Sequence, residues 1–466
     1  MAKKVINPLT RVSGFLEIEV EIDRGIIVNS RSSSVLFRGF EIMLKGRPPL
    51  DAIYFTQRIC GICSAAHSMA ATLALEEALN VIPSPQGKAL RDLVHSCEFL
   101  QNHLRHFYQY TVPDFVALSQ DQCLFEVCHS DFRLPKEMND AIAAHYMQSI
   151  DISRGAHEML ALLGGKAPHD HGIFVGGITV HPTIDKITKF SSLLQKIKNF
   201  VEDCMIPDAT VIAKFYSDYF LWGKGYGNLL SYGIFDEYKD LPNLYVQPSV
   251  FINGVINPLD KKQIVEYLDY AWYQNGGPEP PFEGETKPDV FKEGAYSWSK
   301  APRYGNIPCE VGPLARMILS GEYRNGISMM DRTLARVLEV RKIISIMEHL
   351  LDYIQLNLAP QDIYEVPSQA QAAGLTDTTR GALGHWLRIT DKVISHYQVI
   401  TPTAWNASPR DNLGQRGVIE EALVGTPVKD PENPVEIGRI VRSFDPCISC
   451  ATHVHLVKGK KTLRLV

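Results

Sequence analysis

Four of the nine cysteines in the sequence form two Cys-x-x-Cys pairs, Cys60 with Cys63 and Cys447 with Cys450. The pairs lie near opposite ends of the 466-residue chain, so only the folded structure can bring them together. Four thiolates suit zinc, an iron–sulfur cluster or nickel, because soft sulfur ligands bind soft and borderline metals. This arrangement favours metal or redox chemistry over a disulfide framework.

Two simpler interpretations of the cysteines remain open at this stage. From the pairs alone, a structural zinc site with four cysteine ligands is the stronger one. Its usual pattern places the pairs about 15–20 residues apart, however, and here they span the chain. In the other interpretation the pairs are separate, one a redox dithiol and the other part of the core. The residues around the pairs must therefore decide.

The sequence next to the first pair predicts the element that positions it. Residues 64–79 are rich in Ala, Met, Leu and Glu, which predicts a helix beginning directly after Cys63. Residues 15–22 alternate apolar and acidic side chains and the pattern resumes at 26–28 after a turn, which predicts a hairpin. Residues 376–416 are dense in Gly, Pro, Trp and Asn and predict ordered loops.

Apolar stripes at helical spacing predict most of the remaining fold. They occur at 90–108, 136–163, 184–215 and 327–356, and indicate long helices that pack as a bundle. Residues 228–309 contain many Gly, Pro and aromatic residues with short β-like runs, which indicates a peripheral lobe. The expected fold class is α+β, predominantly α, with a long-helix bundle core and small N-terminal and peripheral β elements.

Composition and charge argue against several classes of function. Hydrophobic residues make up 45% of the chain, charged residues 21%, and the formal net charge is -5, so no nucleic-acid partner is expected. A helix that spans a bilayer needs about 20 consecutive apolar residues, and no stretch of the sequence is close to that length. An integral membrane protein is therefore not expected. The first residues lack the apolar segment of a signal peptide, which favours a cytoplasmic location unless a partner's signal directs export.

The residues around the cysteines resemble the two signatures of the large subunit of nickel–iron hydrogenases. These are Arg58-Ile-Cys-Gly-Ile-Cys63, followed by His67, and Asp445-Pro-Cys-Ile-Ser-Cys-Ala-Thr-His453. Further blocks that match the family are Asn7–Arg11, Arg38–Glu41, Cys309–Arg316, Arg380–Trp386 and Thr401–Asn406. The resemblance covers nearly the whole chain in order, and it outweighs the zinc interpretation.

The resemblance implies a nickel–iron centre held by all four paired cysteines. Cys60 and Cys447 would bind nickel terminally, and Cys63 and Cys450 would bridge nickel and iron. The iron of such centres has carbon monoxide and cyanide ligands.

Further ligand positions also follow from the resemblance. Pro402 and Thr403 would contact the diatomic ligands of the iron, and threonine in place of a frequent serine keeps the hydroxyl donor. Glu41, the backbone carbonyl of Val399 and His453 would bind Mg²⁺, a hard cation that prefers oxygen ligands and water.

The resemblance assigns catalytic roles as well. Dihydrogen would be split into a hydride and a proton, with the proton taken by Cys447 or Arg380. Asp445 would hold Arg380 by a charge-assisted hydrogen bond, and a helix N-cap is its alternative role. His67 lies one helical turn past Cys63 and would approach the bridging sulfur, whereas a core histidine bonded to a backbone carbonyl is the simpler interpretation.

Several side chains near these blocks have two open interpretations. Glu310 would either bond a magnesium-bound water or form an ion pair with Arg316. His103 and His106 are equally compatible with a functional role and with a place in the core.

The electrons released by this reaction must leave through iron–sulfur clusters, and the remaining cysteines show no cluster spacing. The resemblance therefore implies an iron–sulfur small subunit, with further partners such as a nicotinamide-linked (NAD) diaphorase, ferredoxin or a membrane cytochrome. Residues 1–453 would form the hydrogenase domain, with 228–309 as the possible lobe. Residues 454–466 would be a tail removed by a maturation endopeptidase.

Two other functions can be built on the same chain. One is a hydrogen-sensing regulatory subunit, and the other is a structural or quinone-binding relative. The four cysteines, Arg380 and Asp445 argue against the relative, because respiratory members of that kind have lost the cysteines. The tail favours an enzyme over a sensor.

Three positions depart from the family pattern. Ser13 stands where the family has a glutamate that accepts the proton beyond the terminal cysteine, so the proton route is open. Asn102 replaces a frequent aspartate near the arginine, and Thr379 replaces a frequent proline. Both changes predict a less anionic setting for Arg380 and a divergent subgroup.

Overall fold

The computed structural model describes residues 2–119, 129–236, 238, 243–274, 276–356 and 363–448. The α-helices are α1 Phe40–Met43, α2 Asp51–Thr56, α3 Ser64–Leu79, α4 Pro85–Arg105, α5 Lys136–Gly164, α6 Ile184–Phe200, α7 Ile206–Phe215, α8 Pro313–Leu319, α9 Met329–Tyr353, α10 Pro402–Asn406, α11 Val418–Leu423 and α12 Val435–Ser443. The 3-10 segments are η1 Gln57–Ile59, η3 Val112–Asp114, η5 Ser217–Phe220 and η6 Lys261–Gln263, and the π-helical segments are η2 His106–Thr111 and η4 Val201–Met205.

The strands form small antiparallel sheets. Four sheets have three strands, in the orders β1-β2-β3, β6-β7-β8, β10-β9-β11 and β12-β13-β14, and β4 pairs with β5. The strands are β1 Ala2–Ile6, β2 Leu16–Asp23, β3 Ile26–Ser34, β4 Ile173–Phe174, β5 Gly177–Ile178, β6 Leu229–Ser231, β7 Ser249–Ile252, β8 Val255–Pro258, β9 Ile264–Tyr267, β10 Pro278–Glu279, β11 Ala301–Tyr304, β12 Gln369–Thr378, β13 Gly381–Thr390 and β14 Val393–Ile400. The predicted mixture of helices and strands is confirmed, as is the N-terminal hairpin.

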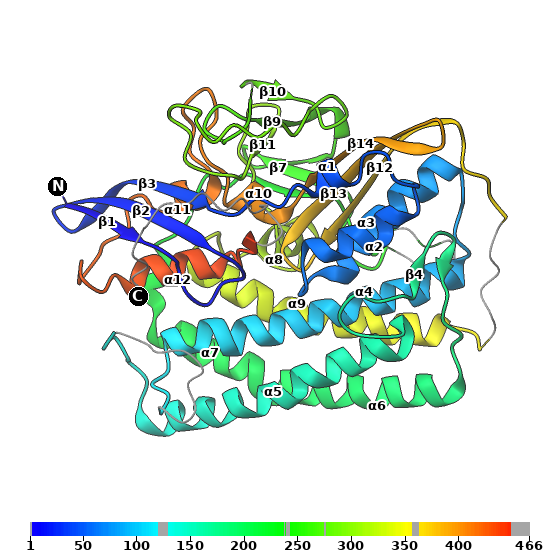
Figure 1. Cartoon of the computed structure of the whole chain (residues 1–466). Coiled ribbons are helices and arrows are strands. Elements are labelled where there is room, and N and C mark those ends of the chain that lie inside the picture. The colour runs from blue at the N-terminus through cyan, green and yellow to red at the C-terminus, as the bar shows by residue number, and fades with distance from the viewer. Residues whose placement is uncertain are drawn as a thin grey trace.

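The long helices occupy the lower half of the molecule in Figure 1, where α4 packs against α5 and α9, and α5 against α6. The segment predicted as one helix over 184–215 contains η4 between α6 and α7, which adds a local π turn. Sheet β12-β13-β14 lies above this layer together with α3, and the β9 sheet lies at the top (Figure 1).

Helix α3 packs closely on β12, and small residues allow it. A side chain at Gly374 of β12 would place its Cβ 2.0 Å from the Ala70 carbonyl oxygen, so only glycine fits there. The alanine-rich sequence of α3 buries most of its residues on all sides, and not on a single stripe. This close approach fixes the helix that follows Cys63 against the sheet that leads to Arg380.

The prediction of loops over 376–416 was wrong for its first part. Residues 369–400 form β12, β13 and β14, and β13 is buried at nearly every position. A strand covered on both faces loses the alternation of apolar and polar residues that identifies strands in a sequence. Its glycines, which indicate loops, are required here by close packing.

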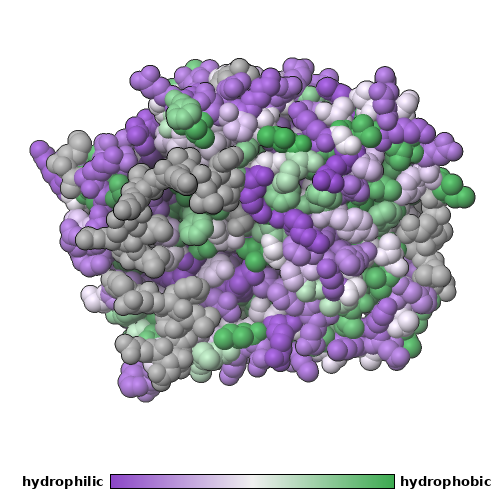
Figure 2. All heavy atoms as spheres, viewed as in Figure 1, coloured by the Kyte–Doolittle hydropathy of each residue, from purple (hydrophilic) through white to green (hydrophobic). Residues whose placement is uncertain are grey.

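The surface in Figure 2 is largely polar, with hydrophobic residues in small scattered groups. None of the helices that the structure describes combines the length and apolar character needed to cross a membrane.

Candidate metal centre

Three of the four paired cysteines meet inside the protein. The sulfur atoms of Cys60, Cys63 and Cys447 all lie within 4.8 Å of one another, and all three residues are buried. The Sγ atoms of Cys60 and Cys447 are 3.4 Å apart, well beyond the about 2.05 Å of a disulfide. The interpretation as two separate pairs is therefore wrong. Cys450 and His453 lie outside the described residues.

Each cysteine is positioned at the end of an element or in an extended pairing. Cys60 follows η1 in an extended conformation, and Cys63 is the N-cap residue of α3. Cys447 pairs in parallel with Ser13, because Ile448 N–H donates to the Ser13 carbonyl at 2.6 Å. The backbone N–H of Cys447 also donates to the Thr403 hydroxyl at 2.9 Å. Segments from both ends of the chain thus enclose the sulfur cluster.

Arg380 lies beside the sulfur cluster and is fixed by several acceptors. Its Nε donates to the Asp445 carbonyl at 2.9 Å, and its Nη2 donates to the Asp445 carboxylate at 3.0 Å and to the Asn102 amide oxygen at 2.7 Å. The Asn102 amide nitrogen donates in turn to Asp445 at 2.7 Å. The amide can accept from the arginine and donate to the carboxylate, which an ionised aspartate cannot do.

The charges of Arg380 and Asp445 stabilise each other. Burial lowers the pKa of Arg380, but Asp445 and the three cysteine sulfurs outweigh burial and hold this pKa well above its ordinary value. Burial raises the pKa of Asp445, whereas Arg380 and the neighbouring His106 and Arg336 lower it, to about 2. The guanidinium is therefore a permanent cation, and Asp445 is its ionised partner. The alternative role of Asp445 as a helix N-cap is not needed to explain it.

A small cavity opens beside Cys63 and Arg380. It is lined by Cys63, Ala66, His67, Thr378, Arg380, Leu383, Pro402 and Thr403. Pro402 and Thr403 begin α10 directly after β14. The Thr403 oxygen accepts from Cys447, so its hydroxyl hydrogen remains available as a donor. The structure thus brings five sequence-predicted residues to one cavity: Cys63, His67, Arg380, Pro402 and Thr403.

His67 is not a core histidine bonded to a backbone carbonyl. Its Nδ1 lies 3.1 Å from Nε2 of His385, and burial lowers the pKa of His67 to about 3, although Cys447 opposes the shift. His385 was missed as a site residue by sequence reasoning. It lies within the matched block Arg380–Trp386, but nothing in its spacing indicates a contact with His67.

Glu98 of α4 supports the start of α3. Its carboxylate accepts from the backbone N–H groups of Ala65 at 2.8 Å and Ala66 at 3.3 Å, which are otherwise unpaired at a helix N-terminus. Burial nevertheless raises the pKa of Glu98 from 4.5 to about 8. Nothing in the sequence pattern indicates this residue, because a glutamate inside a helix usually faces solvent.

This pKa predicts a pH-dependent effect of Glu98→Gln on stability. Between pH 4.5 and about 8 the folded protein retains a proton that the unfolded chain has released, so stability falls as pH rises. The variant cannot titrate, so its stability relative to the wild type should increase by about 1.4 kcal/mol per pH unit in this window. Urea midpoints at pH 5, 6, 7 and 8 measure it. Glu77→Gln, on the exposed face of α3, is the control, and a difference that is constant with pH would contradict the assignment.

Glu41 belongs to a buried cluster of charges near the sulfur site. Its carboxylate accepts from the Val399 N–H at 2.9 Å and from the Thr286 hydroxyl, and it lies 3.9 Å from the Lys300 ammonium. Lys300 also lies 3.4 Å from Glu266. Burial raises the pKa of Glu266 to about 7, and Glu41 adds to the shift while Lys300 opposes it. Two carboxylates thus share one ammonium, an excess of negative charge that a bound cation would neutralise.

Glu310 does not form the predicted ion pair with Arg316. Its carboxylate binds Arg332 of α9 through two hydrogen bonds of 2.7 Å, and Arg316 instead binds Glu339 through two bonds of 2.7 Å. Arginine forms such paired contacts readily with whichever carboxylate the fold presents. The predicted ion pair between Glu310 and Arg316 was therefore wrong.

His103 and His106 have partners in the core. His103 Nε2 lies 2.7 Å from the Glu339 carboxylate, and His106 Nε2 lies 2.7 Å from the Arg442 carbonyl. Both side chains are buried.

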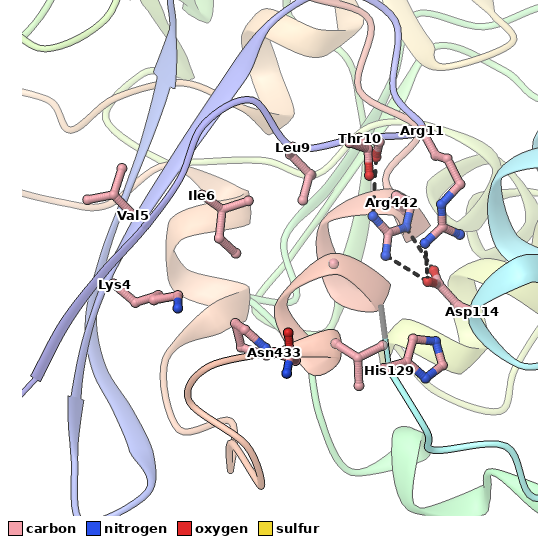
Figure 3. A pocket seen from close by; sticks show the side chains of 13 residues that line it. Lys4, Val5, Ile6, Leu9, Thr10, Arg11, Asp114, His129, Asn433 and Arg442 are labelled. Carbon is pink, nitrogen blue, oxygen red and sulfur yellow. Dashed lines mark hydrogen bonds and ion pairs between the residues drawn. The ribbon is translucent and has the colours of Figure 1, made fainter. Parts of the chain in front are cut away.

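A separate pocket lies between β1 and α12 and is lined by residues of both elements (Figure 3). Thr10 and Arg11 line it, and Asp114 joins Arg11 and Arg442 there: Arg442 Nε and Nη2 each donate to the Asp114 carboxylate at 2.8 Å. The N-terminal segment therefore leads from Cys447 to a polar group at a surface pocket.

A cluster of buried thiols, closed by segments from both chain ends and faced by a fixed guanidinium, defines a metalloprotein with a thiolate-bound centre. Within the described part of the chain it is the only group of three or more His, Cys, Asp or Glu side chains placed closely enough to hold a metal ion. The geometry alone does not select the metal.

Comparisons with known proteins identify the metal as nickel. The family model "Nickel-dependent hydrogenase" matches residues 38–122, 124–327 and 319–453. The chain is 37% identical to the periplasmic [NiFeSe] hydrogenase large subunit of Desulfomicrobium baculatum, covering 98% of this chain and 96% of that protein. It is 32% identical to the hydrogenase-1 large chain of Escherichia coli K12, covering 97% and 94%.

Solved structures agree. The H2-activated [NiFeSe]-hydrogenase of Desulfomicrobium baculatum matches with a TM-score of 0.93 at 37% identity, over 97% of this chain and 100% of that one. The reduced Ni-Fe-Se hydrogenase of D. vulgaris Hildenborough matches with a TM-score of 0.92 at 36% identity, over 97% and 100%. The chain belongs to the nickel-dependent hydrogenase family and is a large subunit of that family.

The family confirms the predicted enzyme class, a nickel–iron hydrogenase. The zinc interpretation of the cysteines was therefore wrong. The expected cytoplasmic location finds no support, since the Desulfomicrobium baculatum relative is named as periplasmic.

Proposed function

We propose that this chain is the catalytic subunit of a nickel–iron hydrogenase that splits dihydrogen heterolytically and reversibly. The observation that supports this most directly is the placement of Arg380 beside the three sulfurs and at the cavity of Cys63. Cys60, Cys63, Cys447 and Cys450 would hold the metals. When bound, the nickel–iron centre, with carbon monoxide and cyanide on iron, supplies a redox-active pair of metals at which dihydrogen is polarised.

Different side chains of the protein would orient the guanidinium and accept the proton. Arg380 stays protonated, so it acts as a fixed positive charge at the cavity and not as a base. The Cys447 sulfur would therefore accept the proton, since metal coordination lowers the pKa of a thiol. Asp445 and Asn102 orient the guanidinium, and the Pro402–Thr403 turn would receive the diatomic ligands.

The buried cluster around Glu41 supports a magnesium site, with the Val399 carbonyl and His453 as the other protein ligands. Its excess negative charge fits a hard cation. The relatives are named as large subunits or large chains. We therefore propose an iron–sulfur small subunit as the partner that accepts the electrons, with a diaphorase or ferredoxin as a further acceptor.

The domain assignment and location complete the proposal. Residues 1–453 would form one domain built on a core of long helices, and residues 228–309, which contain the short strands β6 to β11, would form a peripheral lobe. The tail at 454–466 lies outside the described residues, and we propose that a maturation endopeptidase removes it. A regulatory hydrogen sensor has less support, because the relatives above are named hydrogenases. A cytoplasmic or periplasmic site of action would depend on the partner.

Metal analysis and infrared spectroscopy test this function. The chain is produced with its maturation factors and small subunit, and nickel, iron and the cyanide and carbonyl stretching bands are measured together with hydrogen oxidation. We expect stoichiometric nickel and bands for both the carbonyl and the cyanide ligands. A correctly processed sample without nickel and without these bands would refute the proposal.

Substitution of Ser13 is expected to change the rate of proton transfer and to leave metal binding unchanged. The Ser13 segment connects Cys447 to the pocket of Arg11 and Asp114, which supports a route through its hydroxyl and water. Ser13→Glu should raise the rate of proton exchange at unchanged nickel content, and Ser13→Ala should lower it, each by about 10-fold or more, because a positioned carboxylate transfers protons more effectively than a hydroxyl. Isotope exchange between H2 and D2O measures this. Equal rates in all three proteins would place the proton route elsewhere.

A further inference from the structure

A chain of three buried aromatic side chains connects the sheet to the metal-site cavity. The Tyr397 hydroxyl lies 2.8 Å from Nδ1 of His385, and Nε2 of His385 lies 3.1 Å from Nδ1 of His67. The three residues are at most 1% exposed. His385 and Tyr397 lie diagonally across β13 and β14, because Leu387 is the direct partner of Tyr397. α3, which contains His67, packs against this sheet.

The Tyr397 hydroxyl sets the direction of these hydrogen bonds. Among the described residues, it has His385 as its one hydrogen-bond partner. If the hydroxyl accepted from His385, its own hydrogen would be buried without an acceptor, which is unfavourable. The hydroxyl therefore donates to Nδ1 of His385. This tyrosine is a donor of fixed direction, since it is buried in the hydrophobic cluster that also contains Leu387, Ile389 and Ile394.

The direction of the hydrogen bond from Tyr397 determines which ring nitrogen donates in the bond between His385 and His67. An imidazole whose Nδ1 accepts a hydrogen bond has a single N–H, on its other ring nitrogen. With Nδ1 accepting from Tyr397, the proton is on Nε2, which donates to Nδ1 of His67. His67 then accepts at Nδ1 and has its own proton on Nε2, the ring nitrogen left for the cavity that it lines together with Cys63.

We propose that Tyr397, acting through His385, fixes His67 in the tautomer with its proton on Nε2, so that His67 donates a hydrogen bond toward the thiolates of the metal centre. Tyr397 and His385 are positioning residues, and neither touches the reacting atoms. The inference rests on the proposed function for the identity of the centre, but the tautomer belongs to the protein itself. The opposite tautomer would turn a lone pair of His67 toward an anionic sulfur, which is repulsive.

The tautomer is measured first in the metal-free full-length protein. Nitrogen-15 NMR of histidine-labelled protein, with the His67 signals assigned by their loss in His67→Gln, reports which ring nitrogen has the proton. In the wild type we expect a protonated Nε2 and an accepting Nδ1. In Tyr397→Phe we expect both tautomers to be populated, because His385 no longer has a fixed direction. Protonation of Nδ1 in the wild type would overturn the inference and requires no variant to fold.

The second measurement uses the metal-loaded complex. Loss of a hydrogen bond leaves more electron density on a thiolate, so the carbonyl and cyanide bands of Tyr397→Phe and His385→Phe should shift to lower wavenumber. The matched control is Tyr108→Phe, which also removes a buried hydroxyl, one that donates to Asp208 at 2.8 Å in the helical layer. Its bands should stay unchanged.

The outcomes separate the two proposals. Unchanged His67 tautomers and unchanged bands in Tyr397→Phe overturn the role of Tyr397. A wild type that never shows the bands overturns the proposed function, and the metal-free NMR experiment still decides the tautomer.

Discussion

Cys447→Ser is expected to reduce hydrogen–deuterium exchange to the level of metal-free protein. The Cys447 sulfur is fully buried, 3.4 Å from that of Cys60, and its backbone is fixed by Thr403 and Ser13. A serine hydroxyl fits the space but is a hard ligand that stays protonated at neutral pH, so it replaces neither the soft metal ligand nor the proton acceptor. Loss of activity should therefore accompany loss of nickel.

Exchange activity and nickel content are measured on the same processed complex. The matched control is Cys97→Ser, since Cys97 is also fully buried and its Sγ donates within α4 to the Leu93 carbonyl at 3.2 Å, a bond that a serine hydroxyl can replace. The control should retain nickel and exchange. Normal exchange in Cys447→Ser would remove Cys447 from both of its assigned roles.

Arg380→Lys is expected to lower the hydrogen-oxidation rate about 10²–10³-fold, the usual effect of losing one preorganised donor at a reaction centre. The guanidinium binds the Asp445 carbonyl, the Asp445 carboxylate and Asn102 at the same time through its planar fork. An ammonium on a flexible stem cannot hold these three contacts in one geometry. Since Arg380 is no metal ligand in this assignment, nickel and the infrared bands should remain.

Arg388→Lys is the control for this change, because Arg388 lies on the same strand, β13, with its side chain exposed. It should alter neither rate nor metal content. Full activity of Arg380→Lys would show that the positive charge suffices without its orientation. Loss of nickel from Arg380→Lys would instead show that Arg380 is required for assembly of the centre.

The sequence predicted the helices around the site better than the sheet. Helix α3 was predicted with its observed bounds, because Ala, Met and Leu have high helix propensity and Cys63 ends an irregular stretch. Strand β13 was missed, since Gly381 and Gly384 read as loop residues and burial on both faces removes alternation. At Gly381 an added Cβ would lie 2.6 Å from the Gly312 nitrogen, and φ is +124°, so both close packing and the hairpin turn require glycine there.

The candidate site was predictable only where residues matched a known pattern. Spacing alone left zinc as the stronger interpretation of Cys60 and Cys447, and the resemblance changed it. Residues that act through the fold gave no such signal: the contacts of Glu98 with α3 and of Tyr397 with His385 depend on packing between elements. Periodicity describes which face of an element is buried, but it does not identify the partner side chain across an interface.

The pairing of Ser13 with Cys447 joins segments at nearly opposite ends of the sequence. Contacts of such large sequence separation form slowly, and on a ribosome that adds about 5–20 residues per second, tens of seconds separate the synthesis of the two segments. Cys60 and Cys63 can meanwhile reach their places beside α3 while the cluster still lacks its third sulfur. The order of synthesis thus creates an interval in which Cys60 and Cys63 are present in the nascent chain and Cys447 is not, so the three-sulfur cluster can close only after synthesis has reached the C-terminal segment.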